Sequence, residues 1–146
     1  MKIEGEFLFD KATPTAVWNF LTDPDRIARC LPGCEKLVPL DDGTYEMTLI
    51  FGVGAIRGKF GGTIRLHDIH AMTDYRMNVS GSGTVGFVNG EGTIRLEPDD
   101  AGIHVSYTGD VAAGGPIAAV GQRMMSGAAR MIIDQFFKCV AGNLQS

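Results

Sequence analysis

The chain has 146 residues, a length typical of one domain, and 45% of them are hydrophobic against 21% charged. Thirteen Lys and Arg stand against 17 Asp and Glu, which gives a formal net charge of −4. Nucleic-acid-binding proteins usually carry a basic excess, so we expect no nucleic-acid partner. These values favour a single domain over residues 1–146.

The ends and the cysteines indicate the cellular setting. The N-terminus lacks the apolar core of a secretory signal, and no stretch approaches the ~18 consecutive apolar residues of a membrane span. The three cysteines are an odd number, which favours a reducing compartment. We therefore expect a cytoplasmic protein. Cys30 and Cys34 lie close in sequence, and they are interpreted as structural thiols, with a redox pair as the alternative.

Residues 2–9 alternate between apolar and charged side chains, which predicts a half-buried strand. Thr13 followed by Pro14 is a helix start, with a hydroxyl cap before a proline at the first helical position. Asp23 followed by Pro24 repeats this signal. The sequence therefore predicts two short helices directly after the first strand.

From Cys34 onward the apolar period becomes two, and turn signals recur at near-regular spacing. This pattern predicts an antiparallel meander of about six strands. The apolar side chains predicted to face inward are Tyr45, Met47, Leu49, Phe51, Val53, Ile56, Phe60, Ile64, Leu66, Tyr75, Met77, Val79, Val85, Phe87, Ile94, Leu96, Ile103, Val105, Tyr107 and Val111.

A break at residues 114–116 precedes one long helix, predicted over residues 117 to about 140. The helix is expected to pack on the sheet through one side. The residues of that side are Val120, Met124, Ala128, Met131, Ile132 and Gln135. The fold class is therefore α+β: a curved antiparallel sheet of about seven strands wrapped around a long C-terminal helix.

The chain contains 20 glycines, and many of them fall on the predicted inner faces of strands. Glycines leave space there, and the facing helix is rich in small residues and in adaptable methionine. This predicts an apolar ligand cavity; the alternative is that the helix simply packs closer to the sheet. The predicted ligand-binding residues are Phe51, Met77, Val79, Val85, Phe87, Met124, Met125, Ala128 and Ile132.

Motifs that would carry chemistry are weak. Residues 81–86 match a dinucleotide fingerprint, but no helix start follows them. His67 and His70 point to opposite faces of a strand, so we predict no metal site. The inner faces offer mainly tyrosines as polar groups, and no catalytic constellation appears. We therefore expect a binding protein, not an enzyme.

Several segments resemble one known family over nearly the whole chain. They are CLPGCE at residues 30–35, GVGAIRGKFGG at 52–62, the stretch 81–96 and DVAAGGPIA at 110–118. They are similar to the CoxG family of carbon monoxide dehydrogenase subunits. The resemblance implies the START-like helix-grip fold, in the superfamily of lipid-transfer proteins and polyketide cyclases.

The resemblance also implies a non-catalytic accessory role beside a molybdenum hydroxylase of the carbon monoxide dehydrogenase type. A quinone or other lipid in the cavity would link that enzyme to the membrane electron-transport chain, with no covalently bound cofactor. Longer family members carry a C-terminal extension thought to serve membrane attachment, whereas this chain ends at Ser146. Membrane contact is therefore expected to be transient. The alternatives are a cyclase- or hydrolase-type enzyme of the same superfamily and a ligand-free assembly factor.

Overall fold

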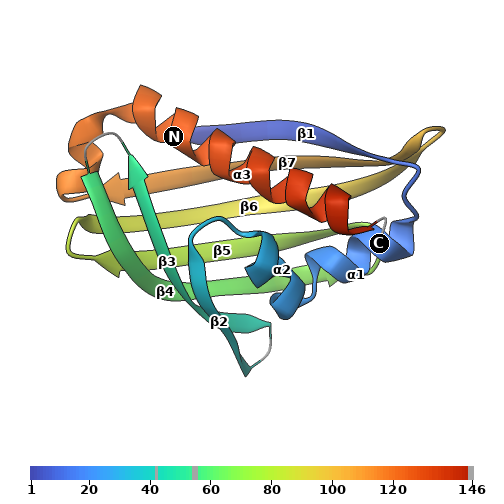
Figure 1. Ribbon diagram of the computed structural model, residues 1–146, viewed down its shortest axis with the longest axis horizontal. Coiled ribbons are helices and arrows are strands. Elements are labelled where there is room, and N and C mark those ends of the chain that lie inside the picture. The colour runs from blue at the N-terminus through green and yellow to red at the C-terminus, as the bar shows by residue number, and fades with distance from the viewer. Residues whose placement is uncertain (42, 54–55, 145–146) are drawn as a thin grey trace.

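The fold begins with strand β1 (Lys2–Asp10) and the short helices α1 (Pro14–Leu21) and α2 (Pro24–Cys30) (Figure 1). Along the described part of the chain, the next strands are β2 (Cys34–Asp41), β3 (Thr44–Val53), β4 (Ile56–His70), β5 (Asp74–Gly83), β6 (Gly86–Asp99) and β7 (Gly102–Gly114). A 3-10 helix, η1 (Pro116–Val120), leads into the long helix α3 (Gln122–Leu144). The computed structural model describes residues 1–41, 43–53 and 56–144, and only the backbone of Phe51, Val53 and Ile56.

The two short helices begin where the sequence predicts. The hydroxyl oxygen of Thr13 accepts a hydrogen bond from the backbone N–H of Ala16 over 3.2 Å. The carboxylate of Asp23 accepts one from the N–H of Asp25 over 3.0 Å. A proline occupies the first helical position after each cap. Local capping chemistry therefore fixes both starts.

The described strands form one antiparallel sheet in the order β1-β7-β6-β5-β4-β3-β2. Each strand from β2 to β6 pairs with the next strand along the chain, and β1 forms the other edge by pairing with β7. The sheet curves, and α3 runs obliquely across its inner side (Figure 1). This confirms the predicted α+β class, with two short helices after the first strand and a long helix at the end.

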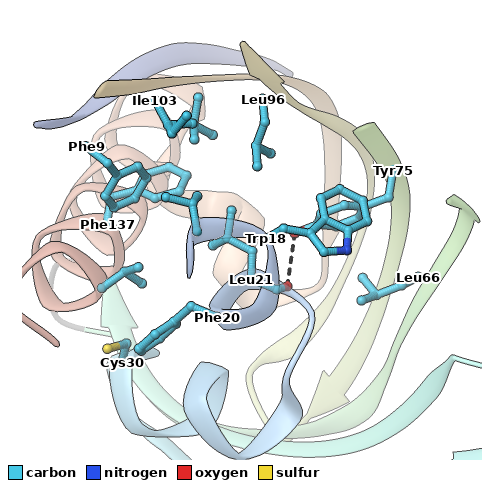
Figure 2. Packing of buried hydrophobic residues seen from close by; sticks show 13 residues of the cluster. Phe9, Trp18, Phe20, Leu21, Cys30, Leu66, Tyr75, Leu96, Ile103 and Phe137 are labelled. Atoms are coloured by element: carbon cyan, nitrogen blue, oxygen red, sulfur yellow. Dashed lines mark hydrogen bonds between the residues drawn. The ribbon is translucent and has the colours of Figure 1, made fainter. Parts of the chain in front are cut away.

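Among the described residues, two clusters of buried side chains lie between the sheet and the helices. The main cluster includes Phe9, Trp18, Tyr75 and Phe137, drawn in Figure 2. Trp18 meets Tyr75 edge-on, with ring centroids 5.7 Å apart, and Phe9 meets Phe137 in the same way at 5.9 Å. A smaller cluster of Phe60, Ile117 and Met125 packs where η1 and the start of α3 meet the sheet.

The inward orientation predicted for Phe87 is wrong. Strand β5 ends at Gly83, and β6 begins at Gly86, where φ is +124°. This turn shifts the alternation by one residue, so Val88 takes the inner face and Phe87 the outer one. Phe87 is 45% exposed there, and its ring lies over Gly114 of the paired strand β7.

The long helix also begins later than predicted. Residues 116–120 form the 3-10 helix η1, and Gly121, with φ of +92°, separates it from α3. A 3-10 helix has about three residues per turn, so a stripe of side chains extrapolated from Val120 is out of phase with α3. Consequently Met124 and Met131 are exposed, whereas Met125, Phe137 and Val140 are buried.

Cys30 and Cys139 form a disulfide that joins the end of α2 to α3. Their Cα atoms lie 5.3 Å apart, although the two residues are 109 positions apart in sequence. The interpretation of Cys30 as a free structural thiol is therefore wrong, and so is its pairing with Cys34. Cys34 is a free, half-buried thiol at the start of β2.

Candidate functional site

A cavity of about 320 Å³ lies between the inner face of the sheet and the helices. Its wall is almost wholly apolar. The sheet contributes Ile3, Leu37, Tyr45, Ile64, Leu66, Tyr75, Met77, Val79, Val88, Ile94, Tyr107 and Val111, and the helices and the loop after α2 contribute Leu21, Ile27, Leu31, Ile132, Ile133, Phe136 and Phe137. A space of this size and character suits a small apolar ligand.

Glycines explain why the space on the sheet side is not filled. Gly90, Gly92 and Gly109 line the cavity from β6 and β7, and Gly92 pairs directly with Gly109. A Cβ at Gly90 would meet only ordinary contacts, at 3.5 Å from the Asp110 carbonyl oxygen. A side chain added at Gly90 would therefore fit on the sheet and extend into the cavity.

The polar groups of the wall are chiefly three tyrosines. The Tyr75 hydroxyl donates a hydrogen bond to the Leu21 carbonyl oxygen, and burial raises the pKa of Tyr75 well above its usual value. Burial also raises the pKa of Tyr107, with opposing effects from Arg130, which lowers it, and Asp134, which raises it. Tyr45 and Tyr107 make no side-chain hydrogen bond to the described residues. The raised pKa values leave Tyr75 and Tyr107 as neutral hydrogen-bond donors that are poorly suited to act as bases near pH 7.

The described cavity wall offers no positively charged side chain that could pair with an anionic ligand. The described lining residues include no Lys, Arg or His. Glu91 borders the cavity only through its backbone, because it alternates with the inward Gly90 and Gly92 and its exposed carboxylate lies on the outer face of the sheet. Burying a carboxylate or phosphate beside this wall would leave the anion without a cationic partner, which is costly. The site is therefore suited to a neutral ligand that offers hydrogen-bond acceptors to tyrosine hydroxyls.

Three of the predicted ligand-binding residues meet at this cavity: Met77, Val79 and Ile132. Val85, Met125 and Ala128 lie instead in or against the smaller cluster around Phe60. The remaining three do not contribute to the described wall. Met124 is 49% exposed, Phe87 is on the outer face, and the side chain of Phe51 lies outside the described residues.

Two parts of the wall were not fully predicted from the sequence: the C-terminal half of α3 and the α2 side. Ile133 and Phe136 lie at helical spacing and share the cavity face of α3 with Ile132, which was predicted. The adjacent aromatics Phe136 and Phe137 were the available signal for that face. The sequence predicts Ile27 and Leu31 on the inner stripe of the second short helix, but seven residues are too few to show that this stripe faces a cavity and not packed core.

A second hollow, of about 600 Å³, lies on the outer side of the sheet. It is a shallow surface lined largely by Thr, Ser and Asn side chains, with Arg65 at one side and Glu91 and Asp110 at the other. Its described lining contains no aromatic side chain on which a ring could stack. The enclosed inner cavity is therefore the stronger candidate site.

The described residues contain neither a cluster of metal-ligating side chains nor a membrane-spanning helix. No group of three or more His, Cys, Asp or Glu side chains is placed to hold a metal ion within residues 1–41, 43–53 and 56–144. In the same ranges, no helix is both long and apolar enough to cross a membrane.

Several solved structures share this architecture. A conserved protein from Geobacillus kaustophilus has a TM-score of 0.94 and 34% identity, covering 99% of this chain and 95% of that one. An aromatase/cyclase named ZhuI from Streptomyces has a TM-score of 0.72 at 15% identity, with coverage of 99% and 93%. The protein Ara h 8.0201 has a TM-score of 0.69 at 16% identity, with coverage of 99% and 97%.

The likeness to the last two shows the helix-grip fold alone. No curated protein matches the chain. A family model for the carbon monoxide dehydrogenase subunit CoxG matches residues 5–145. That match covers strands β2 to β7, helices α1 to α3 and every described residue of the cavity wall except Ile3. The chain therefore belongs to the CoxG family of carbon monoxide dehydrogenase subunits.

Proposed function

We propose that the protein is a non-catalytic accessory protein that carries a neutral apolar ligand, a quinone or another lipid, in its inner cavity. The observation that supports this most directly is the apolar cavity of about 320 Å³, which glycines of β6 and β7 line on the sheet side. Each methylene group buried there would contribute about 0.8 kcal/mol to binding. The hydroxyls of Tyr45 and Tyr107, which make no side-chain hydrogen bond to the described residues, would hold carbonyl or hydroxyl oxygens of the ligand head.

The partner in this proposal is a molybdenum hydroxylase of the carbon monoxide dehydrogenase type. Membership of the CoxG family supports this assignment. The carried ligand would pass electrons from that enzyme to the membrane electron-transport chain. The protein would then act in the cytoplasm, with transient contact at the inner face of the membrane.

Solvent extraction followed by mass spectrometry tests ligand carriage. The protein is purified without detergent from cells that make quinones, and the extract is compared with that of an unrelated protein of similar size. We expect a neutral lipid or quinone in near-stoichiometric amount. An empty extract, together with no binding of added quinone, would contradict carriage and favour the assembly-factor alternative.

A matched pair of glycine variants tests the location. Gly90→Leu places a side chain into the cavity, whereas Gly61→Leu places the same side chain in open space on the outer face of β4. We expect Gly90→Leu to lose most quinone binding and Gly61→Leu to keep it, with far-UV circular dichroism confirming that both fold. Equal binding by the two variants would contradict the proposed location.

A catalytic role remains a second candidate, because the structural relatives include an aromatase/cyclase. Such chemistry would depend on the unpaired phenols in the wall. Tyr45→Phe and Tyr107→Phe separate the two candidates. An enzyme acting on a polyketide-like substrate should lose turnover in at least one variant, whereas a carrier should keep ligand binding within about tenfold in both.

A further inference from the structure

Helix α2 is held against α3 by a covalent bond more than by packing. Of the seven residues of α2, all of them described, only Cys30 is buried. Cys30 is 4% exposed and is bonded to Cys139, which lies in the C-terminal half of α3. An element with so little buried surface is expected to open locally at low cost once a restraint is removed.

The same two helices both contribute side chains to the cavity wall. Ile27 from α2 and Leu31 directly after it face the cavity on one side, and Ile133 and Phe136 from α3 face it on the other. The disulfide therefore ties together two parts of the wall. The disulfide joins two helices and involves no residue of a strand, so the hydrogen-bonded strand pairs of the sheet do not depend on this bond.

We propose that the Cys30–Cys139 disulfide is a redox-controlled clamp on the cavity. When the bond is formed, α2 is fixed to α3 and ligand exchange is slow. When the bond is reduced, α2 separates from α3 and exchange becomes fast. The clamp goes beyond the proposed carriage of a ligand, and it requires only that the cavity admit an apolar probe.

The reduction itself needs a dithiol reductant. One thiolate of the reductant attacks Sγ of the half-buried Cys139, the Cys30–Cys139 bond breaks, and Cys30 leaves as a thiolate that takes up a proton. The second thiol of the reductant then attacks the mixed disulfide, which releases Cys139 and forms the reductant's own disulfide. Two electrons and two protons pass to the protein in total. Disulfides in a reducing compartment usually act in this transient way.

The third cysteine supplies a control. Cys34 is free, and its thiol donates to the carbonyl oxygen of Lys36 over 3.5 Å. Burial raises the pKa of the Cys34 thiol, which keeps it protonated and makes it a weak nucleophile. Cys34→Ser should therefore leave the clamp and its response to reductant intact.

The test follows release of N-phenyl-1-naphthylamine, an apolar fluorescent probe, from the protein into excess phosphatidylcholine vesicles in a stopped-flow instrument. Wild type and Cys34→Ser are measured before and after treatment with dithiothreitol. We expect reduction to speed release about tenfold in both. Cys139→Ser should release quickly from the start and should not respond to dithiothreitol.

A bridge that cannot be reduced separates the clamp from other effects of reductant. Cys34→Ser protein is reduced, freed of dithiothreitol and treated with dibromobimane, which joins two neighbouring thiols by alkylation. Release from this cross-linked protein should be slow and should stay slow when dithiothreitol is added again. Equal release rates in the two redox states would overturn the proposal, as would free thiols at Cys30 and Cys139 in protein isolated without reductant. Loss of the sheet signal in circular dichroism on reduction would also overturn it, because the bond would then hold the whole fold. Binding of the probe tests the proposed function; only the response to reduction tests the clamp.

Discussion

The Tyr75 hydroxyl donates a hydrogen bond over 3.3 Å to the carbonyl oxygen of Leu21, and so joins the central strand β5 to the last residue of α1 (Figure 2). The ring of Tyr75 also meets Trp18 of the same helix. This pair of contacts fixes α1 over the end of the cavity that Leu21 and Tyr75 both line.

Replacing Tyr75 with Phe should lower the free energy of unfolding by about 1–2 kcal/mol. The variant keeps the ring contact with Trp18 but leaves the buried Leu21 carbonyl without its side-chain donor. Urea unfolding followed by circular dichroism measures the change. The control is Tyr45→Phe, which removes a hydroxyl with no side-chain hydrogen bond to the described residues and should change stability by less than about 0.5 kcal/mol. Equal losses in the two variants would contradict this role for the hydrogen bond.

Stability should also fall at high pH because of Tyr75. Burial raises the pKa of Tyr75 in the folded protein above the value of about 10 expected for the unfolded chain. The folded state therefore keeps a proton that the unfolded state loses. The contribution to stability is complete below about pH 10 and declines as the pH rises above that value. Unfolding free energies measured from neutral pH to about pH 11 should fall less steeply in Tyr75→Phe than in wild type.

The elements of the fold could be predicted because their signals are local. A cap residue before a proline marks each short helix, and alternation over several residues marks each strand. The predicted side-chain orientations were wrong where a local backbone conformation interrupted the regular alternation of a strand or the periodicity of a helix. The turn before Gly86 reversed the face of Phe87, and the 3-10 helix before Gly121 shifted the phase of α3. Neither change leaves a side-chain signal that a periodicity analysis detects.

The candidate site was predictable only in kind. Glycines on inner faces indicated a cavity, and Met77, Val79 and Ile132 do line it. Its position under α2 and the C-terminal half of α3 depends on contacts between distant parts of the chain. The bond from Cys30 to Cys139 spans 109 positions, and nothing near either residue in sequence indicates the pairing.

Neighbouring glycines of β4 should respond in opposite ways to alanine. A Cβ at Gly62 would collide with the backbone carbonyl oxygen of Ser80 on the paired strand, which cannot move without breaking the ladder. Gly62→Ala should therefore destabilise the protein by roughly 2 kcal/mol or more. A Cβ at Gly61 meets nothing within 4 Å, so Gly61→Ala should be neutral or stabilising by about 0.5 kcal/mol. Thermal unfolding by calorimetry compares the two, and a similar loss in both would show that the strands adjust freely there.

Reducing the disulfide should lower the free energy of unfolding by roughly 3–5 kcal/mol. The bond closes a loop of more than a hundred residues, so it removes much of the conformational freedom of the unfolded chain. Urea unfolding with and without dithiothreitol measures the difference, and Cys34→Ser should show the same loss as wild type. A Cys30→Ala, Cys139→Ala variant should match reduced wild type and be indifferent to reductant. If dithiothreitol also destabilised that double variant, the loss of stability on reduction could not be assigned to the Cys30–Cys139 bond.

The cavity should discriminate against anions in a pH-dependent way. Its described lining carries no Lys, Arg or His, so an ionised fatty acid would be buried without a cationic partner. The neutral acid pays no such cost, and its fraction rises about tenfold for each pH unit below neutrality while the carboxyl group remains mostly ionised. Apparent affinity for a long-chain fatty acid should therefore rise by close to tenfold per pH unit, or about a hundredfold between about pH 8 and pH 6, in a competition assay with a fluorescent apolar probe. The methyl ester of the same acid has no charge to lose, so its affinity should stay constant over this range. An ionised acid that binds as tightly as its ester would mean that the head of the ligand lies in solvent, outside the cavity.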